Sequence, residues 1–251
     1  MTLDLSSFGC DLNVVVFGAS GGIGASIVHL FAECPNVRKI NAFSRTKPQA
    51  LHDDVDYESF DLLDEASIER AAGIVADPID IVFVATGLLH DTLTSGALVK
   101  PEKSWRAFDP QAAQLIYQIN AIGPMLIAKH FLQKLAGDKK SAFAAISARV
   151  GSIGDNQIGG WYSYRSSKAA LNQMIRTASI ELQRKKPQAL CVSLHPGTVD
   201  TALSKPFQGN VPHSKLFEPQ VSALSMLNVL NGLSTEHSGQ QFAFDGVKIV
   251  P

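Results

Sequence analysis

A tyrosine and a lysine in the second half of the chain have the types and spacing needed for proton transfer. Tyr164 and Lys168 stand at positions i and i+4 of a segment with helical periodicity, so both side chains leave the same face of the helix. A phenol with its ordinary pKa of about 10 is a poor acid–base catalyst at neutral pH. A neighbouring ammonium group stabilises the phenolate and lowers that pKa toward the working range. The pair therefore predicts general acid–base catalysis by Tyr164, whereas Tyr162 lies off this face.

A glycine-rich loop near the start of the chain has the pattern of a phosphate-binding site. It reads G-A-S-G-G-I-G over 18–24 and separates an expected strand from an expected helix. Gly18 permits a tight turn, while Gly22 and Gly24 let the backbone approach a pyrophosphate without a β-carbon in the way. The unpaired N–H groups and partial positive charge at the start of a helix favour such an anion. We therefore expect this loop, with Ser20 and Ile23, to bind a dinucleotide cofactor.

The residues after the expected second strand indicate which dinucleotide binds. Folds that select NAD carry an acidic residue there for the ribose hydroxyls, whereas arginine suits the 2′-phosphate of NADP. The stretch from Ser44 to Lys47 contains no acid and two bases. Arg45 can pair with a phosphate through two parallel hydrogen bonds, and Lys47 can add charge nearby. Two bases in an exposed loop are also common as solvated surface, but this location favours NADP(H) over NAD(H).

The elements that must position these residues alternate between buried strands and amphipathic helices. Apolar runs predict strands over 13–17, 37–43, 57–60, 79–85, 141–146, 190–194 and 241–245. Helical periodicity predicts helices over 24–34, 64–75, 110–135 and 164–184, and one more around Asn228. Strands that alternate with helices pair in parallel through right-handed crossovers. The predicted fold is therefore α/β, a doubly wound parallel sheet (Rossmann fold) with helices on both faces, and residues 1–251 are predicted to form a single domain.

These motifs together resemble those of the short-chain dehydrogenase/reductase (SDR) family, and the resemblance covers nearly the whole chain. The loop over 18–24 is similar to the family's TGxxxGxG loop, with Phe17 in place of the usual threonine, and Tyr164-x-x-x-Lys168 is similar to its catalytic motif. The stretch over 152–162 most resembles the C-factor-like and sniffer-like carbonyl reductase branch. The resemblance implies an enzyme that transfers a hydride between NADP(H) and a small-molecule carbonyl or alcohol substrate. In it Tyr164 would donate the proton, and Lys168 would lower its pKa and hold the cofactor ribose.

The same resemblance suggests further site residues. Asn120 is similar to the family's fourth catalytic residue, which holds a water for the proton relay. Asp61 and Leu62 occupy the adenine-contact position, and Thr86 and Gly87 occupy the place of an Asn-Ala-Gly motif whose asparagine is missing. The nicotinamide carboxamide would meet a segment similar to PGxxxT, made of Pro196, Gly197, Val199 and Thr201.

The catalytic serine is the point at which the sequence departs from the family. The family carries Ser-Ser at the end of the fifth strand, and its second serine polarises the substrate carbonyl. If Gly151 anchors the alignment, Ala148 occupies that position and Ser147 precedes it. Either Ser147 supplies the hydroxyl through a one-residue register change, or Ser152 reaches in from the loop, or the site lacks this donor. We expect Ser147, and losing such a hydrogen bond costs about 10²–10³ in rate in comparable oxyanion sites.

Composition excludes several other classes of function. The chain has 251 residues, 45% of them apolar, so it can bury a globular core and is not a disordered chain. Its 22 basic and 23 acidic residues leave no net charge that would attract nucleic acid or lipid. No apolar run approaches the roughly 18 residues of a membrane span, and the first residues lack the basic region of a secretory signal. The three cysteines and seven histidines show no metal-ligand spacing, so we expect reduced thiols, no metal and a cytoplasmic location.

Two further expectations concern the surface of the protein. The segment over 202–219 has no clear period, and a loop of this length predicts a substrate lid, with Lys205, Phe207, His213 and Phe217 as candidate lining residues. The family that the chain resembles often pairs the catalytic helix across a two-fold axis, so an apolar stripe on this helix implies a homodimer or homotetramer, although the stripe could instead pack on its own sheet. The stripe consists of Ser167, Leu171, Met174, Ala178 and Leu182.

Two other functions stay open from sequence. A nucleotide-binding signalling or sensor protein of the C-factor type, with little turnover, agrees with Ala148 and with the missing asparagine before Thr86. An epimerase or dehydratase acting on nucleotide-sugars agrees less well, because those relatives carry a larger C-terminal substrate domain.

Overall fold

Parallel strands form the central sheet of this computed structural model, which describes residues 3–47, 54–92 and 98–251. The spatial order of the seven strands is β11-β8-β7-β4-β1-β2-β3, and every neighbouring pair is parallel. Their bounds are β1 Leu12–Phe17, β2 Val37–Ser44, β3 Val55–Ser59, β4 Ile81–Val84, β7 Ser141–Ile146, β8 Ala189–His195 and β11 Gln241–Ala243. The predicted doubly wound sheet is confirmed.

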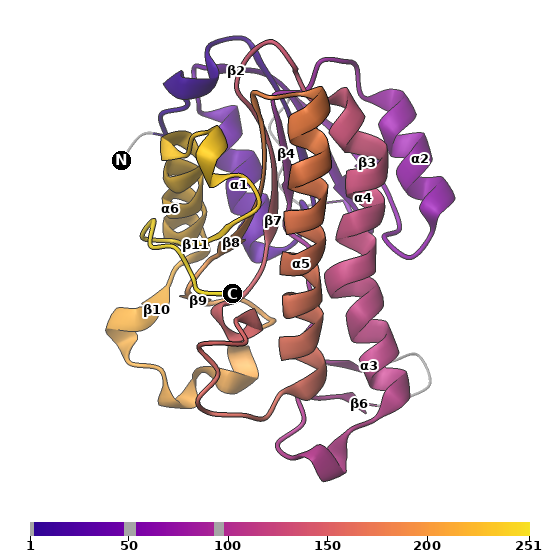
Figure 1. Ribbon diagram of the computed structural model, residues 1–251, viewed down its shortest axis with the longest axis vertical. Helices are drawn as coiled ribbons and strands as arrows, with labels where there is room; N and C mark the ends of the chain where they lie inside the picture. The colour runs from indigo at the N-terminus through magenta and orange to yellow at the C-terminus, as the bar shows by residue number, and fades with distance from the viewer. Residues whose placement is uncertain (1–2, 48–53, 93–97) are drawn as a thin grey trace.

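Helices cover both faces of the sheet because successive side chains of its strands point to opposite sides. Val14 and Val16 belong to a core shared with α1 (Gly22–Ala32) and α6 (Pro219–Gly232). Val15 and Phe17 belong to a second core, on the other face. The helices of that face are α2 (Glu65–Ile74), α4 (Gly123–Phe131) and α5 (Tyr162–Lys185), and Figure 1 shows α4 and α5 side by side. β1, whose six residues are all buried, is therefore covered on both sides.

The single helix predicted over 110–135 is wrong in detail, because the chain forms several helical pieces there. α3 (Pro110–Tyr117) is followed by a wider π-helical turn over Gln118–Ile122, then α4, then a 3₁₀ turn over Leu132–Lys134. Pro124 explains the interruption, since it has no N–H to donate to the carbonyl four residues earlier, on Asn120. The irregular turn therefore contains one of the predicted catalytic residues.

Two small pairs of strands were not predicted from the sequence. β5 (Asp91–Thr92) pairs antiparallel with β6 (Leu98–Val99), and β9 (Thr198–Val199) pairs in parallel with β10 (Leu216–Phe217). Strands of two residues show no periodicity, so only the folded chain reveals them. The predicted lid over 202–219 is accordingly ordered: it contains 3₁₀ turns over Lys205–Asn210 and His213–Lys215, then β10, and ends at the first residue of α6. The side chain of His213 lies outside the described part.

The described residues provide neither a membrane span nor a metal cluster. None of the helices there is both long and apolar enough to pass through a membrane. The same residues contain no group of three or more His, Cys, Asp or Glu that could hold a metal ion. Cys10, Cys34 and Cys191 form no disulfide.

Candidate active site

Tyr164 and Lys168 lie in the first turns of α5, at the carboxyl end of the sheet. Both are buried: Tyr164 is 8% exposed and Lys168 is 1% exposed. The Lys168 Nζ donates a hydrogen bond of 2.9 Å to the backbone carbonyl of Ile146, the last residue of β7, and lies 6.0 Å from the centre of the Tyr164 ring. The helix and the strand end thus hold the amine and the phenol in one buried environment.

Burial changes the protonation of both groups, in directions that the sequence did not anticipate. It raises the pKa of Tyr164 to about 12, because the phenolate loses its hydration. It lowers the pKa of Lys168 to about 7, because the ammonium loses its hydration in the same way. The lysine was expected to lower the pKa of the tyrosine, but desolvation outweighs that effect here. The phenol is therefore protonated at neutral pH and can serve as an acid.

Asn120 connects the loop after β4 to the catalytic helix. It is fully buried, and its Oδ1 accepts a hydrogen bond of 2.7 Å from the backbone N–H of Leu88. Its Nδ2 donates to the Leu88 carbonyl at 2.8 Å and to the Ser167 hydroxyl at 3.1 Å. Because all of these partners belong to the protein, the side chain holds Leu88 and α5 at a fixed distance.

The three possibilities for the serine differ clearly in the structure. Ala148 packs against Tyr164 and Leu89, so the position next to the phenol carries no hydroxyl. Ser152 is engaged within its own loop, where its Oγ accepts from the Asp155 N–H at 3.1 Å and lies 3.4 Å from the carbonyl of Pro251. The hydroxyl of Ser147 is buried and has no hydrogen-bond partner among the described residues. An unpaired buried hydroxyl costs about 1–3 kcal/mol, so Ser147 is the serine of the three positions whose polar group is left uncompensated.

The glycine loop over 18–24 forms a backbone cradle, in which a side chain at Gly18, Gly22 or Gly24 would collide with neighbouring atoms. Gly18 has φ +82°, and a β-carbon there would lie 2.8 Å from the carbonyl oxygen of Ala85. A β-carbon at Gly24 would overlap the Gly18 carbonyl oxygen, and one at Gly22 would lie 2.8 Å from the Thr201 methyl group. No side chain caps the N-terminus of α1. The N–H groups at that terminus are thus open to an anion.

At the end of β2, the two basic side chains are available for binding and the serine is not. Ser44 is buried, and its hydroxyl contacts the carbonyl of Thr46 at 2.8 Å and the hydroxyl of Tyr57 at 3.0 Å. Arg45 and Lys47 are exposed, and no acidic side chain in the described part pairs with either. A phosphate beside β2 would therefore find free positive charge.

The other predicted contacts on the adenosine side lie at different depths. Asp61 and Ser20 are exposed, and the Asp61 carboxylate accepts a hydrogen bond of 2.9 Å from the backbone N–H of Leu63. Leu62 is buried, and its side chain lies where a β-carbon of Gly123 would be. Ile23 is half-buried and packs on the core beneath α1. Asp61 and Ser20 are thus open to a ligand, whereas Leu62 and Ile23 also serve packing.

The loop after β4 lies beside the catalytic pair. A β-carbon at Gly87 would lie 3.7 Å from the Asn120 Oδ1 and 3.8 Å from the Lys168 Nζ. The Thr86 hydroxyl is buried and, like that of Ser147, lacks a hydrogen-bond partner among the described residues. β4 and β7 are adjacent in the sheet, with Val84 opposite Ala145, so both hydroxyls lie two residues beyond this pair. They leave two unpaired polar groups at the same edge of the sheet.

The segment after β8 closes the other side of the cradle. Gly197 has φ +79°, and the ring of Phe217 lies where its β-carbon would be. Val199 is buried, and Thr201 reaches the glycine loop through its methyl group next to Gly22. Pro196 begins this turn, and its carbonyl accepts a hydrogen bond from α6. The chain thus brings residues near 20 and 200 together.

A model of the family described as short chain dehydrogenase matches residues 12–211 of this chain. The chain belongs to the short-chain dehydrogenase family. An oxidoreductase of Schizosaccharomyces pombe is 30% identical over 264 residues, covering 95% of this chain and 98% of the yeast protein. The C-signal of Myxococcus xanthus is 37% identical over 134 residues, which cover 53% of this chain and 75% of that protein. The predicted family and its similarity to the C-factor type are confirmed.

Solved structures of this family share the fold of the chain. The NADPH-bound carbonyl reductase from chicken fatty liver has a TM-score of 0.80 at 26% identity, and the match covers 96% of this chain and all of the other (100%). The carbonyl reductase Sniffer of Drosophila melanogaster has a TM-score of 0.81 at 22% identity, with the same coverage of 96% and 100%. Short-chain dehydrogenases are oxidoreductases that use a nicotinamide cofactor.

In this dehydrogenase an apolar cluster surrounds Tyr164. Its buried members are Leu89, Ala148 and Tyr164, and its half-buried members are Val150, Trp161, Leu203 and Phe207. Of the lid residues considered from sequence, Phe207 joins the cluster. Phe217 instead packs on Gly197 and on Phe244, with the two ring centres 4.6 Å apart and the ring planes tilted by 57°. Lys205 lies 3.7 Å from Asp200 at the surface. Reasoning from sequence missed Leu89, because nothing local relates the loop after β4 to α5.

Proposed function

We propose that the protein is an NADP(H)-dependent oxidoreductase that transfers a hydride between the nicotinamide and a carbonyl or alcohol substrate. The observation that carries this proposal is the buried pair Tyr164 and Lys168 beside Gly87, at the same edge of the sheet as the glycine cradle. An acid–base pair next to a dinucleotide site is what hydride transfer to a carbonyl requires.

The residues of the cradle fit a phosphorylated dinucleotide. Gly18, Gly22 and Gly24 would hold the pyrophosphate through backbone N–H groups, and Arg45 with Lys47 would hold the 2′-phosphate. When bound, the nicotinamide supplies or accepts the hydride. The NADPH of the chicken carbonyl reductase structure supports this choice over NAD(H).

The chain's own groups account for the proton. The Tyr164 hydroxyl, protonated at neutral pH, donates to the oxygen of a substrate carbonyl, and the Ser147 hydroxyl donates a hydrogen bond to the same oxygen. Lys168 holds the ribose and returns the proton to Tyr164. The side chain of Asn120 positions the loop after β4 against α5. The backbone carbonyl of Asn120, to which Pro124 has no N–H to donate, holds the relay water. The apolar cluster excludes other water from this exchange.

Replacing the phenol tests this function. Tyr164→Phe should lower the turnover number by about 10²–10⁴ and leave the dissociation constant for NADPH unchanged, because only the proton donor is lost. Tyr162→Phe is the matched control, since Tyr162 is an exposed phenol on the same helix. NADPH oxidation with a panel of ketones, aldehydes and quinones measures turnover, and fluorescence titration measures binding. Equal turnover in the two variants would refute the assignment.

One observation favours a second function, a nucleotide-binding sensor with little turnover. Ala148, rather than a serine, packs against Tyr164, and the C-signal of Myxococcus xanthus is a relative. Tight NADPH binding by the unmodified protein, without oxidation by any compound of the same panel, would support this function instead.

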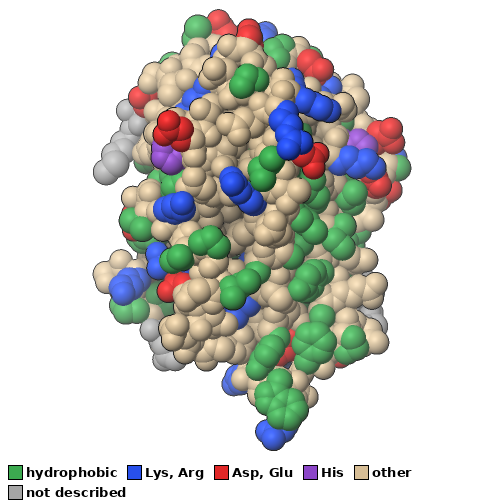
Figure 2. Space-filling view, viewed as in Figure 1, with side chains coloured by type: hydrophobic (Ala, Val, Ile, Leu, Met, Phe, Trp, Pro, Cys, Tyr) green, Lys and Arg blue, Asp and Glu red, His purple; other side chains and the backbone are tan. Residues whose placement is uncertain are grey.

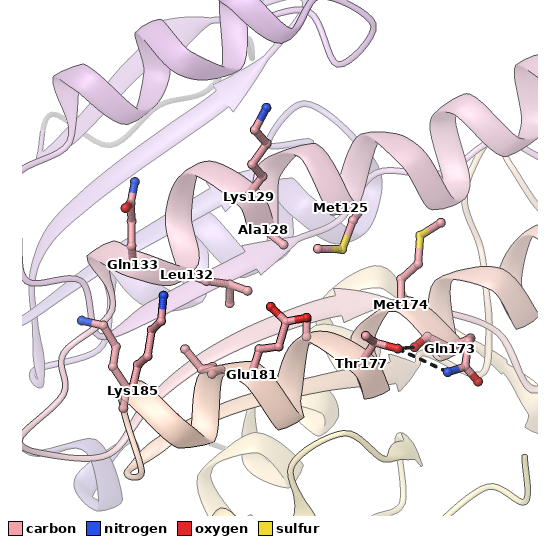
Figure 3. Close-up of a pocket in the computed structure, with 13 residues that line it drawn as sticks. Met125, Ala128, Lys129, Leu132, Gln133, Gln173, Met174, Thr177, Glu181 and Lys185 are labelled. Carbon is pink, nitrogen blue, oxygen red and sulfur yellow. Dashed lines mark hydrogen bonds between the residues drawn. The ribbon is translucent and has the colours of Figure 1, made fainter.

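We also propose that the protein forms a homodimer or homotetramer through the groove between α4 and α5. The groove has a volume of about 610 Å³, and Figure 3 shows Met125 of α4 and Met174 of α5 on its two sides. Figure 2 shows hydrophobic side chains running along the face on which α4 and α5 lie. Met174, Ala178 and Leu182 of the predicted stripe line the groove, whereas Ser167 and Leu171 are buried within the chain and do not. Glu181 lines the groove and offers a charge for pairing with a second copy, whereas Lys129 is already paired with Glu65 at 2.6 Å.

Two more predictions stay proposals. Residues 202–219 act as a substrate lid, which agrees with the contact of Leu203 and Phe207 with the cluster around Tyr164. The protein functions in the cytoplasm, where its three cysteines would remain reduced.

A further inference from the structure

The apolar cluster around Tyr164 contains a chain of aromatic rings. The ring centres of Trp161 and Tyr164 lie 6.1 Å apart, and those of Trp161 and Phe207 lie 5.2 Å apart. The His90 ring lies 5.6 Å from that of Phe207, and its Nε2 contacts the carbonyl of Ala202 at 3.1 Å. The planes meet at 62° to 78°, so each ring presents an edge to its neighbour. Rings from three separate segments thus form one wall beside the proton donor.

Trp161 contributes to this wall from a backbone conformation that bulky residues disfavour. It has φ +54° at the N-terminus of α5, in the left-handed region that bulky residues avoid. Its N–H donates a hydrogen bond of 2.6 Å to the carbonyl of Glu102, and Gly159 and Gly160, with φ +71° and +69°, lead the chain into this conformation. Strained backbone of this kind persists where the surroundings enforce it, often at ligand sites. The strain directs the indole toward Tyr164.

The charged side chains near the wall are engaged elsewhere. Arg165 donates to the carbonyls of Gly160 and Val150, at 3.0 and 3.3 Å. The carboxylate of Glu102 accepts from Ser163, and Lys205 lies 3.7 Å from Asp200. Lys168 also lies near the phenol, but its Nζ donates to the Ile146 carbonyl and, in the proposed function, holds the ribose. A carboxylate held among the rings would therefore lose its hydration without gaining a charged partner there, which disfavours its binding strongly.

The polar groups at the site suit a single carbonyl oxygen. Tyr164 offers one hydroxyl, and the side chains that form the cluster around it are aliphatic or aromatic. Trp161 and Phe207 are half-buried, so part of each ring is open to a ligand. An edge contact between two aromatic rings contributes more binding free energy than the burial of their area alone.

We infer that the substrate is a neutral carbonyl compound with an aromatic ring next to the carbonyl group, and that Trp161 and Phe207 select it. The inference rests on the proposed oxidoreductase function. Three methyl ketones of similar shape test it: acetophenone is neutral and aromatic, cyclohexyl methyl ketone is neutral and saturated, and 4-acetylbenzoate carries a carboxylate.

The chain offers a direct binding signal, because Trp105 and Trp161 are its two tryptophans. Trp105 is 65% exposed and lies outside the cluster, so Trp105→Phe leaves Trp161 as the sole fluorophore. With saturating NADP⁺ no ketone can react, and quenching of Trp161 measures ketone binding alone. Acetophenone should bind about 3- to 10-fold more tightly than cyclohexyl methyl ketone, as expected for ring contacts. It should bind at least about 100-fold more tightly than 4-acetylbenzoate, which must bury a charge.

Phe207→Leu, made in the Trp105→Phe protein, should remove the preference for acetophenone over cyclohexyl methyl ketone. Trp161→Leu, read by calorimetry in the presence of NADP⁺, should do the same. If 4-acetylbenzoate binds as tightly as acetophenone, or if both variants keep the aromatic preference, the inference is wrong. NADPH oxidation by the unmodified protein tests the proposed function separately from this inference. If acetophenone binds selectively but none of the ketones oxidises NADPH, the inferred selectivity holds and the oxidoreductase function is wrong.

Discussion

Glu102 is the side chain outside the predicted site whose loss should most disturb the catalytic helix. It is 5% exposed, and its two carboxylate oxygens lie 3.3 and 3.2 Å from the backbone N–H of Ser163, which is fully buried. The Ser163 hydroxyl also donates to this carboxylate. Ser163 immediately precedes Tyr164, so Glu102 holds the first turn of α5, and the negative charge also suits the positive end of the helix dipole.

The size of the effect follows from these contacts. Glu102→Ala leaves one N–H and one hydroxyl of Ser163 buried without an acceptor. A hydrogen bond to a charged group is worth about 1.5–3 kcal/mol, so the loss of two should lower the free energy of unfolding by about 3–6 kcal/mol. The whole stability of a domain is about 5–15 kcal/mol, so this is a large share of it. At about 2–4 °C per kcal/mol for a chain of this size, the melting temperature should fall by about 10 °C.

Glu102→Gln should lose about half of this free energy, because its amide oxygen still accepts one of the two hydrogen bonds. Glu218→Ala is the matched control: Glu218 also stands at the N-terminus of a helix, but it is exposed and its side chain makes no capping bond. Urea denaturation gives the free energies, and NADPH oxidation at low temperature shows whether the remaining folded enzyme has lost turnover number rather than cofactor affinity. If Glu102→Ala and Glu218→Ala unfold at the same urea concentration, the carboxylate does not hold α5 and the reasoning fails.

Four further predictions concern binding, catalysis and pH. Arg45→Gln should raise the dissociation constant for NADPH by about 10–100-fold and change that for NADH little, because one charge-assisted contact to the 2′-phosphate is lost; equal effects on both cofactors in fluorescence titrations would contradict this. Ser147→Ala should lower the turnover number by about 10²–10³, while Ser152→Ala should leave it nearly unchanged, and the reverse order in steady-state assays would identify Ser152 as the donor. Burial raises the pKa of Tyr164 to about 12, so the phenol that carbonyl reduction needs stays protonated near neutral pH, and the rate of reduction should not fall there through its ionisation. Alcohol oxidation needs the phenolate, so its rate should rise with pH. A pH profile of oxidation that is flat would refute this. Burial lowers the pKa of His195 to about 4, whereas its value in the unfolded chain is about 6.5. Between these pH values the unfolded chain binds a proton that the folded chain does not, so the free energy of unfolding should fall as the pH decreases from about 6.5 to 4. Urea denaturation should show a weaker fall for His195→Asn.

The regular part of the fold could be predicted because its signals are local. The apolar run over 14–17 in β1 and the alternation of strands with helices predict a parallel sheet, and the glycine loop at 18–24 follows its strand directly. The long helix at 110–135 was predicted as one piece because its periodicity continues through Asn120. Pro124 interrupts the helix because it has no N–H to donate to the carbonyl four residues earlier. Hydrophobic periodicity does not reveal such a missing hydrogen bond.

The sequence by itself determined the types and the spacing of the reacting groups: Tyr164 and Lys168 on one helical turn, the glycines before α1, and the bases after β2. Only the tertiary structure decided which of these groups meet and in what surroundings. It buries the hydroxyl of Ser147 without a partner while Ser152 is engaged in its loop, and it packs Ala148 and Phe207 around the phenol. The physical reason is that spacing along the chain defines geometry only within one element. Desolvation, hydrogen-bond partners and pKa values depend on contacts between segments that are far apart in sequence and adjacent in space.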